Sequence, residues 1–265
     1  MGRVARALVV HELSERTRDR WVLVISVLFA LLSSAVSLYG RSAGATAAKL
    51  TGPSLVTLVS LLVPLVALVL GHDAVVGERE RNTLGLLLSL PVNKLEVVLS
   101  KFLGRLLALA AAIAIGLGAA VAMASADNRA VLMQLVLPTL LLGAAFLSLG
   151  VLISAVVRRQ LAAASAVVAV WFLLVFFYDL GLLGLLVLTQ GGIAPGTVAD
   201  LVVANPAGLF RIEMMQRFAG PDVLQNLGMT ASPPGPVAVA AIWAAWILVP
   251  LALSGLLLSR QKVSR

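Results

Sequence analysis

Long apolar stretches with almost no charge are the feature that most constrains this sequence. Trp21–Tyr39 contains no charged residue at all. A bilayer core of ~30 Å needs about 20 apolar residues in a helix. We expect six spans, and the other five are Leu55–Gly71, Phe102–Ala124, Val131–Val157, Leu161–Phe177 with an apolar continuation to Leu188, and Val237–Ser259. The chain is therefore predicted to be an all-α polytopic membrane protein.

The composition agrees with this prediction and excludes several kinds of site. The chain has 265 residues, of which 60% are hydrophobic and 12% are charged, whereas a soluble domain carries roughly 25% charged residues. It contains no cysteine. A disulfide framework, a cysteine-ligated metal and a thiol nucleophile are therefore excluded.

The positions of the basic residues predict the orientation. Of the lysines and arginines outside the spans, fourteen lie on one side and five on the other. The richer side faces the cytoplasm, so we expect both termini there, in a bacterial inner membrane. The net charge of +8 thus reflects contact with membrane lipid and predicts no nucleic-acid partner. Because twenty residues with three acids precede the first span, we do not expect it to be a cleavable signal peptide.

Two regions outside the spans are expected to be helical. Gly2–Arg20 has an apolar face and charged faces, which suits an interfacial helix, although a simple basic anchor fits the same residues. Thr189–Pro236 is rich in proline and glycine and is expected to be a long outer loop. Within it, Pro206–Phe218 predicts a short amphipathic helix whose apolar side holds Leu209, Ile212, Met215 and Met214.

The start of this outer helix carries candidate binding residues. Asn205 is a suitable cap and Pro206 a suitable first helical residue. Phe210 and Arg211 are then expected to project from the first turn. Aromatic residues and arginine are enriched at interfaces, but a helix that only plugs the outer mouth of the protein fits as well.

Catalytic motifs are missing from the sequence. No Gly-Lys pair occurs, so a P-loop is excluded. His11–Glu15 begins like a zinc metalloprotease motif, but Glu15 stands where the second histidine is required. We therefore expect no catalytic residue, no metal site and no cofactor in this chain, and we expect Met214, Met215 and Met229 to fill apolar space.

Charged residues within the spans are also scarce. Arg105 lies one turn into its span and is expected to extend its guanidinium to the inner surface. Asp179 is expected near the outer headgroups, beside Tyr178. An ion-coupled carrier would need polar sites near mid-membrane, so this pattern does not favour one.

Polar residues concentrate between the second and third spans, in residues 72–101. Glu78, Arg79, Glu80 and Arg81 alternate in charge and could pair with a partner of mixed charge. Thr83–Ser89 predicts a short helix with an apolar face of Leu84, Leu87 and Leu88. Pro91 ends it and Asn93 caps the next helix. A plain hairpin that returns the chain to the membrane is the alternative.

This loop resembles a known family. Its Asp73, Glu78, Thr83-Leu84, Leu87-Leu88-Ser89, Pro91-Val92 and Ser100-Lys101-Phe102 are similar to the first cytoplasmic loop of ABC-2 type transporter permeases. The resemblance implies one transmembrane domain over residues 1–265, a homodimer, and a coupling helix that docks a separate cytoplasmic ATPase, which binds ATP and Mg. The docking residues it implies are Glu78, Arg79, Glu80, Arg81, Thr83, Leu84, Leu87 and Pro91.

A narrower resemblance involves the outer loop. Asn205-Pro206 followed by Phe210-Arg211, with Arg20-Trp21 opening the first span, is similar to ABC-2 permeases that serve copper-centre assembly of nitrous oxide reductase. It implies a NosF-type ATPase inside and a periplasmic β-helical NosD-type partner outside, bound through Asn205, Pro206, Phe210 and Arg211. Alternatives are an exporter of an amphipathic solute, lipid or drug, and an ATP-independent carrier.

Overall fold

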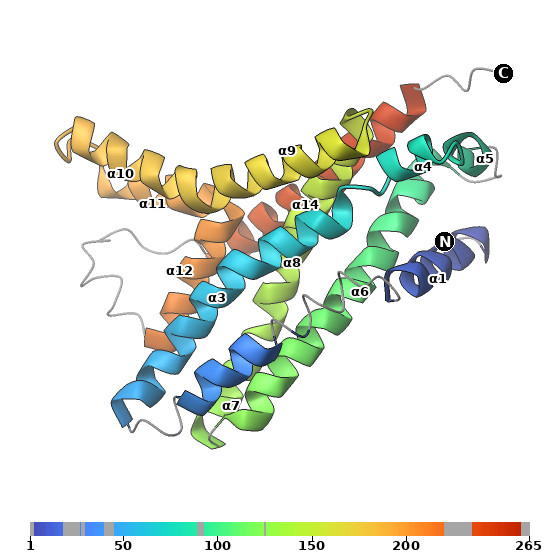
Figure 1. Ribbon diagram of the computed structural model, residues 1–265. Coiled ribbons are helices and arrows are strands. Elements are labelled where there is room, and N and C mark those ends of the chain that lie inside the picture. The colour runs from blue at the N-terminus through green and yellow to red at the C-terminus, as the bar shows by residue number, and fades with distance from the viewer. Residues whose placement is uncertain are drawn as a thin grey trace.

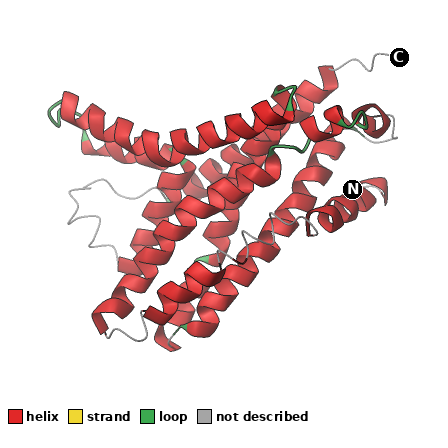
Figure 2. Cartoon of the chain, in the orientation of Figure 1, coloured by secondary structure: helices red, strands yellow, loops and turns green. Residues whose placement is uncertain are grey.

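The computed structural model describes residues 3–17, 27, 30–39, 45–88, 93–124, 126–219 and 235–260. Within these ranges the chain forms helices joined by short turns, and no strand occurs there (Figure 2). The prediction of an all-α protein is confirmed.

Four long helices form the body of the protein. They are α3 (Ala45–Gly71), α6 (Lys94–Met123), α8 (Val136–Val156) and α14 (Pro236–Arg260), which run alongside one another (Figure 1). Helix α8 contacts the other three, and its Leu142, Phe146 and Leu147 are completely buried. The core of the protein therefore surrounds α8.

Five of the predicted spans correspond to helical stretches that are long and apolar enough to cross a membrane. These stretches comprise α3, α6, α8, α14 and the continuous stretch Gln160–Leu188. Residues 21–26, 28 and 29 of Trp21–Tyr39, the first predicted span, lie outside the described residues. Its Ala30–Tyr39 part is an apolar helix. The count of six is thus not confirmed by the described part of the chain.

The fourth span differs from the prediction. Val131–Val157 was expected as one helix, but a turn after Met133 divides it into α7 (Ala126–Met133) and α8. Pro138 lies in the first turn of α8, where its missing N–H costs no hydrogen bond and its ring meets no preceding turn. The proline therefore starts a helix here rather than bending one.

The fifth stretch is continuous but irregular. It consists of α9 (Gln160–Phe172), a π-helical turn η1 (Leu173–Phe177) and α10 (Tyr178–Leu188). Only 17% of its most apolar window is buried within this chain, against 61% for the windows of α3 and α8. This stretch thus turns most of its apolar surface away from the rest of the chain, and the indole of Trp171 anchors it by donating to the Leu61 carbonyl over 3.0 Å.

The segment after α10 does not stay outside the bundle. Helices α11 (Pro195–Ala204) and α12 (Pro206–Ala219) form a hairpin, in which α11 contacts α10 and α12 packs on α3, α8 and α14 (Figure 1). The Asn205 amide donates to the carbonyl of Leu174, midway along Gln160–Leu188, and Trp246, near the middle of α14, donates to the Ala204 carbonyl. The turn of the hairpin therefore lies level with the helix midpoints, so this part of Thr189–Pro236 packs within the bundle, and its assignment to the outer side stays a prediction.

Candidate functional site

The polar loop after α3 forms two short helices at one end of the bundle. These are α4 (Val76–Glu80) and α5 (Leu84–Leu88). The Ser154 hydroxyl of α8 accepts hydrogen bonds from the amides of Val75 and Val76 over 2.9 and 3.0 Å. This side chain replaces a local cap, so the start of α4 is fixed to the centre of the bundle.

The four alternating charges of α4 and the turn after it bind four different parts of the chain. Glu78 pairs with Lys101 of α6 at 2.8 Å, and Arg79 donates to the carbonyl of Val157 at 2.7 Å. Glu80 accepts from the amide of Gln160, the first residue of α9, at 2.7 Å. Arg81 pairs with Glu15 at 3.2 Å. All four charges are therefore engaged within this chain, and their pairing with a partner stays a prediction.

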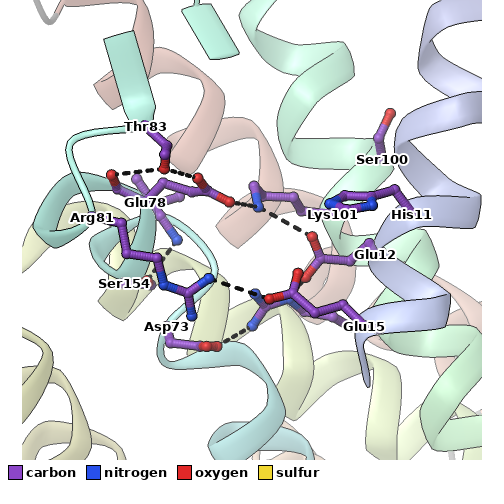
Figure 3. Close-up of polar contacts among 12 residues, drawn as sticks. His11, Glu12, Glu15, Asp73, Glu78, Arg81, Thr83, Ser100, Lys101 and Ser154 are labelled. Carbon is purple, nitrogen blue, oxygen red and sulfur yellow. Dashed lines mark hydrogen bonds and ion pairs between the residues drawn. The ribbon is translucent and has the colours of Figure 1, made fainter. Parts of the chain in front are cut away.

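A buried ion-pair network joins this loop to the amino-terminal helix α1 (Arg3–Thr17). It consists of Glu12, Asp73, Glu78, Lys101 and Arg105, and Figure 3 labels the first four. Lys101 bridges Glu12 at 3.1 Å and Glu78 at 2.8 Å. Arg105 bonds Glu12 at 2.7 Å and also reaches Asp73 and the Leu70 carbonyl.

Arg105 was expected to reach the inner surface, and that expectation is wrong. Its exposed fraction is 1%, the same order as the 3% of Glu12. A guanidinium in apolar surroundings is stable only when it is paired and its donors are satisfied. Both conditions are met here, because carboxylates from α1 and from the end of α3 converge on it.

Helix α1 lies directly against α6. Gly104 makes this possible: a Cβ there would lie 2.7 Å from the Cβ of Glu12 and 2.9 Å from the Val9 carbonyl. The absence of a side chain lets the two helices approach closely enough for Glu12 to reach Lys101 and Arg105. The described part of Gly2–Arg20, residues 3–17, is therefore a helix, as predicted, and it is docked on the bundle rather than being only a basic anchor.

The network carries an excess of negative charge. Three carboxylates, Glu12, Asp73 and Glu78, face the two cations Lys101 and Arg105. Removing one partner from such a cluster leaves a buried charge uncompensated. The network thus holds the loop together with α1, α3 and α6, and it needs all five of its charged side chains to do so.

The apolar side of α5 is only partly available to a partner. Leu84 packs against the core and Leu87 is half-buried. Leu86, which the sequence did not single out, is 73% exposed. Pro91 lies outside the described residues. The exposed apolar surface of this loop therefore centres on Leu86. Thr83 is also exposed, and its hydroxyl bonds Glu78.

The residues predicted to bind an outer partner lie at the hairpin turn. The Asn205 side chain accepts from the amide of Ala207 at 3.1 Å, as expected of a cap, and it donates to the Leu174 carbonyl at 2.6 Å. Pro206 opens α12, also as predicted. Asn205 is 1% exposed, so it fixes the turn within the bundle.

Phe210 was expected to project as an anchor, and this is wrong, since its exposed fraction is 0%. Leu209 and Met214 are buried beside it in the core, whereas Met215 is 37% exposed. The cause is the depth of the turn, which places the first part of α12 among the long helices. Arg211 is about one-third exposed and pairs with Asp179 of α10 at 2.6 Å.

Comparison with protein families decides the broader assignment. Residues 6–263 match the model of the family described as ABC-2 family transporter protein. The chain belongs to the ABC-2 transporter family. The match covers α1, the loop with its ion-pair network, the bundle and the hairpin.

Two relatives of this ABC-2 chain are similar over nearly their whole length. One, described as a probable ABC transporter permease protein NosY from Pseudomonas aeruginosa, is 37% identical over 268 residues, covering 95% of this chain and 96% of the relative. A second protein of the same description, from Stutzerimonas stutzeri, is 38% identical over 266 residues, covering 94% and 96%. The chain is therefore a multi-pass membrane permease subunit of an ABC transporter. Among the residues that the structure describes, no cluster of histidine, aspartate and glutamate suits a metal ion.

Proposed function

We propose that this permease couples a separate NosF-like cytoplasmic ATPase to movement across a bacterial inner membrane, in NosDFY-type maturation of the copper centre of nitrous oxide reductase. Identity of 37–38% to two NosY proteins over about 95% of the chain supports the assignment. ATP and Mg bind to the ATPase, and both termini of the permease lie in the cytoplasm. The permease works as a homodimer, for which the mostly exposed apolar surface of Gln160–Leu188 provides a contact face.

The single observation that carries the proposal is the attachment of α4. Its charges bind α1, α6, the end of α8 and the start of α9 at once. A segment tied to four elements cannot shift alone. Force applied by an ATPase at α4–α5 is therefore passed to the long helices instead of being absorbed by a flexible loop.

The same helices lead to the outer half of the protein. Helix α12 packs on α3, α8 and α14, and α11 is bound to α10 through Tyr178, whose hydroxyl donates to the Leu201 carbonyl at 2.6 Å. Displacement of α3 and α8 at the cytoplasmic end thus moves the hairpin. A periplasmic β-helical NosD-like partner that rests on the outer side receives this motion.

Of the four residues assigned to the outer partner, Arg211 is the one that can reach it. Asn205, Pro206 and Phe210 are buried, so we assign them to shaping the hairpin. Arg211 and Asp179 form a pair that is about one-third exposed at each side chain. A carboxylate of the partner can replace Asp179 at this guanidinium, because arginine donates two parallel hydrogen bonds to a carboxylate.

ATPase docking is tested at Leu86. Leu86→Asp should abolish co-purification of the cognate ATPase, because it places a charge in a contact that becomes desolvated, at a cost of several kcal/mol. The permease itself should insert normally, since Leu86 is exposed. Binding is measured by affinity purification of the ATPase and by its turnover in the reconstituted complex.

Two further variants complete this test. Gly85→Trp adds bulk on the exposed side of α5, where a Cβ meets nothing within 4 Å, so it should also block docking without disturbing the permease. Leu86→Met keeps volume and polarity and should bind as the parent protein does. Normal association in both Leu86→Asp and Gly85→Trp would contradict docking at α5.

The copper-centre role is tested by complementation. A Stutzerimonas stutzeri strain without its own NosY, supplied with this permease and its cognate ATPase, should regain the copper-centre absorbance of nitrous oxide reductase. The Leu86→Asp variant should not restore it, because uncoupled ATPase cannot drive the permease. If the parent protein docks the ATPase but leaves the reductase without its copper centre, the exporter function becomes the better assignment.

A further inference from the structure

A cavity lies between α1 and the α4–α5 loop and is not explained by the fold. Its volume is about 280 Å³, and its lining residues come from α1, the α4–α5 loop and α6. Glu12, Glu78 and Lys101 form its polar side. Leu8, Leu86 and Leu87 contribute apolar walls. The cavity thus has apolar walls and borders the ion-pair network at Glu12, Glu78 and Lys101.

The charge of the lining determines what the cavity can hold. Two carboxylates and one ammonium line it, and the complete network has three carboxylates and two cations. An additional anion would meet a negative surplus, whereas an additional cation would bring the network to neutrality. The Glu78 carboxylate already accepts one bond at each oxygen, from Lys101 and Thr83, and a carboxylate has about four acceptor sites in total. The site is therefore suited to a cationic donor.

The size of the cavity distinguishes a side chain from a larger ligand. Pockets for drug-sized molecules have volumes of about 300–1,000 Å³, and this one lies just below that range. Arginine is among the residues that dominate binding hot spots, where a ring of apolar contacts excludes water around the anchor. Leu86 at the rim is 73% exposed, on the surface where docking is proposed.

We propose that this cavity receives an arginine or lysine side chain of the cytoplasmic ATPase, so that α1 and α5 together form the docking site. The inference rests on the proposed ATPase coupling and deepens it, because it adds α1 to the contact surface and gives the chemistry of the partner's anchor. The anchored cation binds Glu12 and Glu78 beside Lys101. The ATPase is then attached to the ion-pair network as well as to the apolar side of α5.

The test places a competing cation in the cavity. His11 of α1 lines it and is exposed, next to Lys101 in Figure 3. His11→Lys supplies the cavity with an ammonium of its own, so the Kd for the cognate ATPase should rise by about tenfold or more. His11→Glu adds an acceptor and should lower that Kd. Val10→Lys is the matched control, because Val10 is exposed and does not line the cavity; its Kd should stay within about threefold of the parent value.

The anchor itself can be found because the chain contains no cysteine. Leu8→Cys provides one thiol in the cavity wall, and single cysteines replace the surface arginines and lysines of the ATPase in turn. One position should form a disulfide in the assembled complex, and removing that basic residue should make the Kd insensitive to His11→Lys. Absence of any crosslink, or equal effects of His11→Lys and Val10→Lys, would overturn the proposal.

Two other results separate the possible failures. If Gly85→Trp abolishes docking but His11→Lys does not weaken it, the cavity is not the anchor site while the proposed function stands. If Gly85→Trp and His11→Lys both bind normally, the docking site itself is wrongly placed. If His11→Lys leaves the Kd unchanged and lowers the phosphatidylethanolamine retained in native mass spectrometry, a lipid headgroup occupies the cavity and the proposal is overturned.

Discussion

Arg105→Met should destabilise the permease by about 3–5 kcal/mol, the usual cost of removing one member of a buried ion pair. Glu12 would keep Lys101, but Asp73 would lose its guanidinium partner while remaining 6% exposed. A loss of this size corresponds to a fall in Tm on the order of 10 °C for a chain of this length. Thermal unfolding of the purified protein in detergent measures it.

Two comparisons show whether the loss comes from the network. Arg81→Met breaks the exposed pair with Glu15, and it should cost less than about 1 kcal/mol. Combining Arg105→Met with Asp73→Asn removes the carboxylate charge that faced the guanidinium and should recover part of the lost stability. An Arg105→Met protein no less stable than Arg81→Met would show that the network does not hold α1 to the bundle.

Local sequence patterns predicted the helices that local interactions determine. The apolar length of the described spans was correct except for the fourth, which a turn after Met133 divides. The Asn93 start of α6 was also correct, since the backbone N–H of Asn93 donates to the Glu96 carboxylate, three residues ahead, over 3.3 Å. The helices Arg3–Thr17, Leu84–Leu88 and Pro206–Ala219 were also found close to the predicted positions. These features depend on neighbours within a few residues, which the sequence displays directly.

Long-range pairing could not be predicted in the same way. Arg105 was assigned to the surface because its partners, Glu12 and Asp73, are 93 and 32 residues away in the chain. One signal was available: arginine within a span usually pairs with an acid at the same depth. Glu12 and Asp73 both lie near the expected cytoplasmic edge, so this pairing could have been proposed.

The exposure of Phe210 was mispredicted for a different reason. The sequence pattern of α12 predicted the helix correctly. Which of its side chains are buried depends on how far the Asn205 turn enters the bundle. Gly208 carried a signal of this close packing, because a Cβ there would lie 2.2 Å from the Val202 carbonyl. The prolines and glycines of Thr189–Pro236 indicate turns. They do not show whether the helices between those turns pack into the bundle or lie outside it.

Gly150→Val should also destabilise the permease strongly. Among the described helices, α3 and α8 form the most extensive pair, and a Cβ at Gly150 would lie 2.9 Å from both the Gly71 Cα and the Leu68 carbonyl. These atoms belong to the backbone, so no side chain can rotate away. Small residues allow membrane helices to approach this closely, and overpacking such a site costs 1–3 kcal/mol or more. Gly118→Val on α6, where a Cβ meets nothing within 4 Å, should change the Tm little.

The same substitution should disturb the candidate docking loop. Ser154 lies one turn beyond Gly150 on α8 and holds the amides of Val75 and Val76. If valine at position 150 moves α3 away from α8, these hydrogen bonds break and the two amides should exchange with solvent faster. The rate of hydrogen exchange at the amides of residues 75–76 measures this separately from global unfolding. In the assembled complex, the ATPase should then turn over ATP at the same rate with and without the permease. A Gly150→Val protein with a lower Tm but unchanged protection of these amides would show that the α3–α8 contact stabilises the bundle without positioning α4.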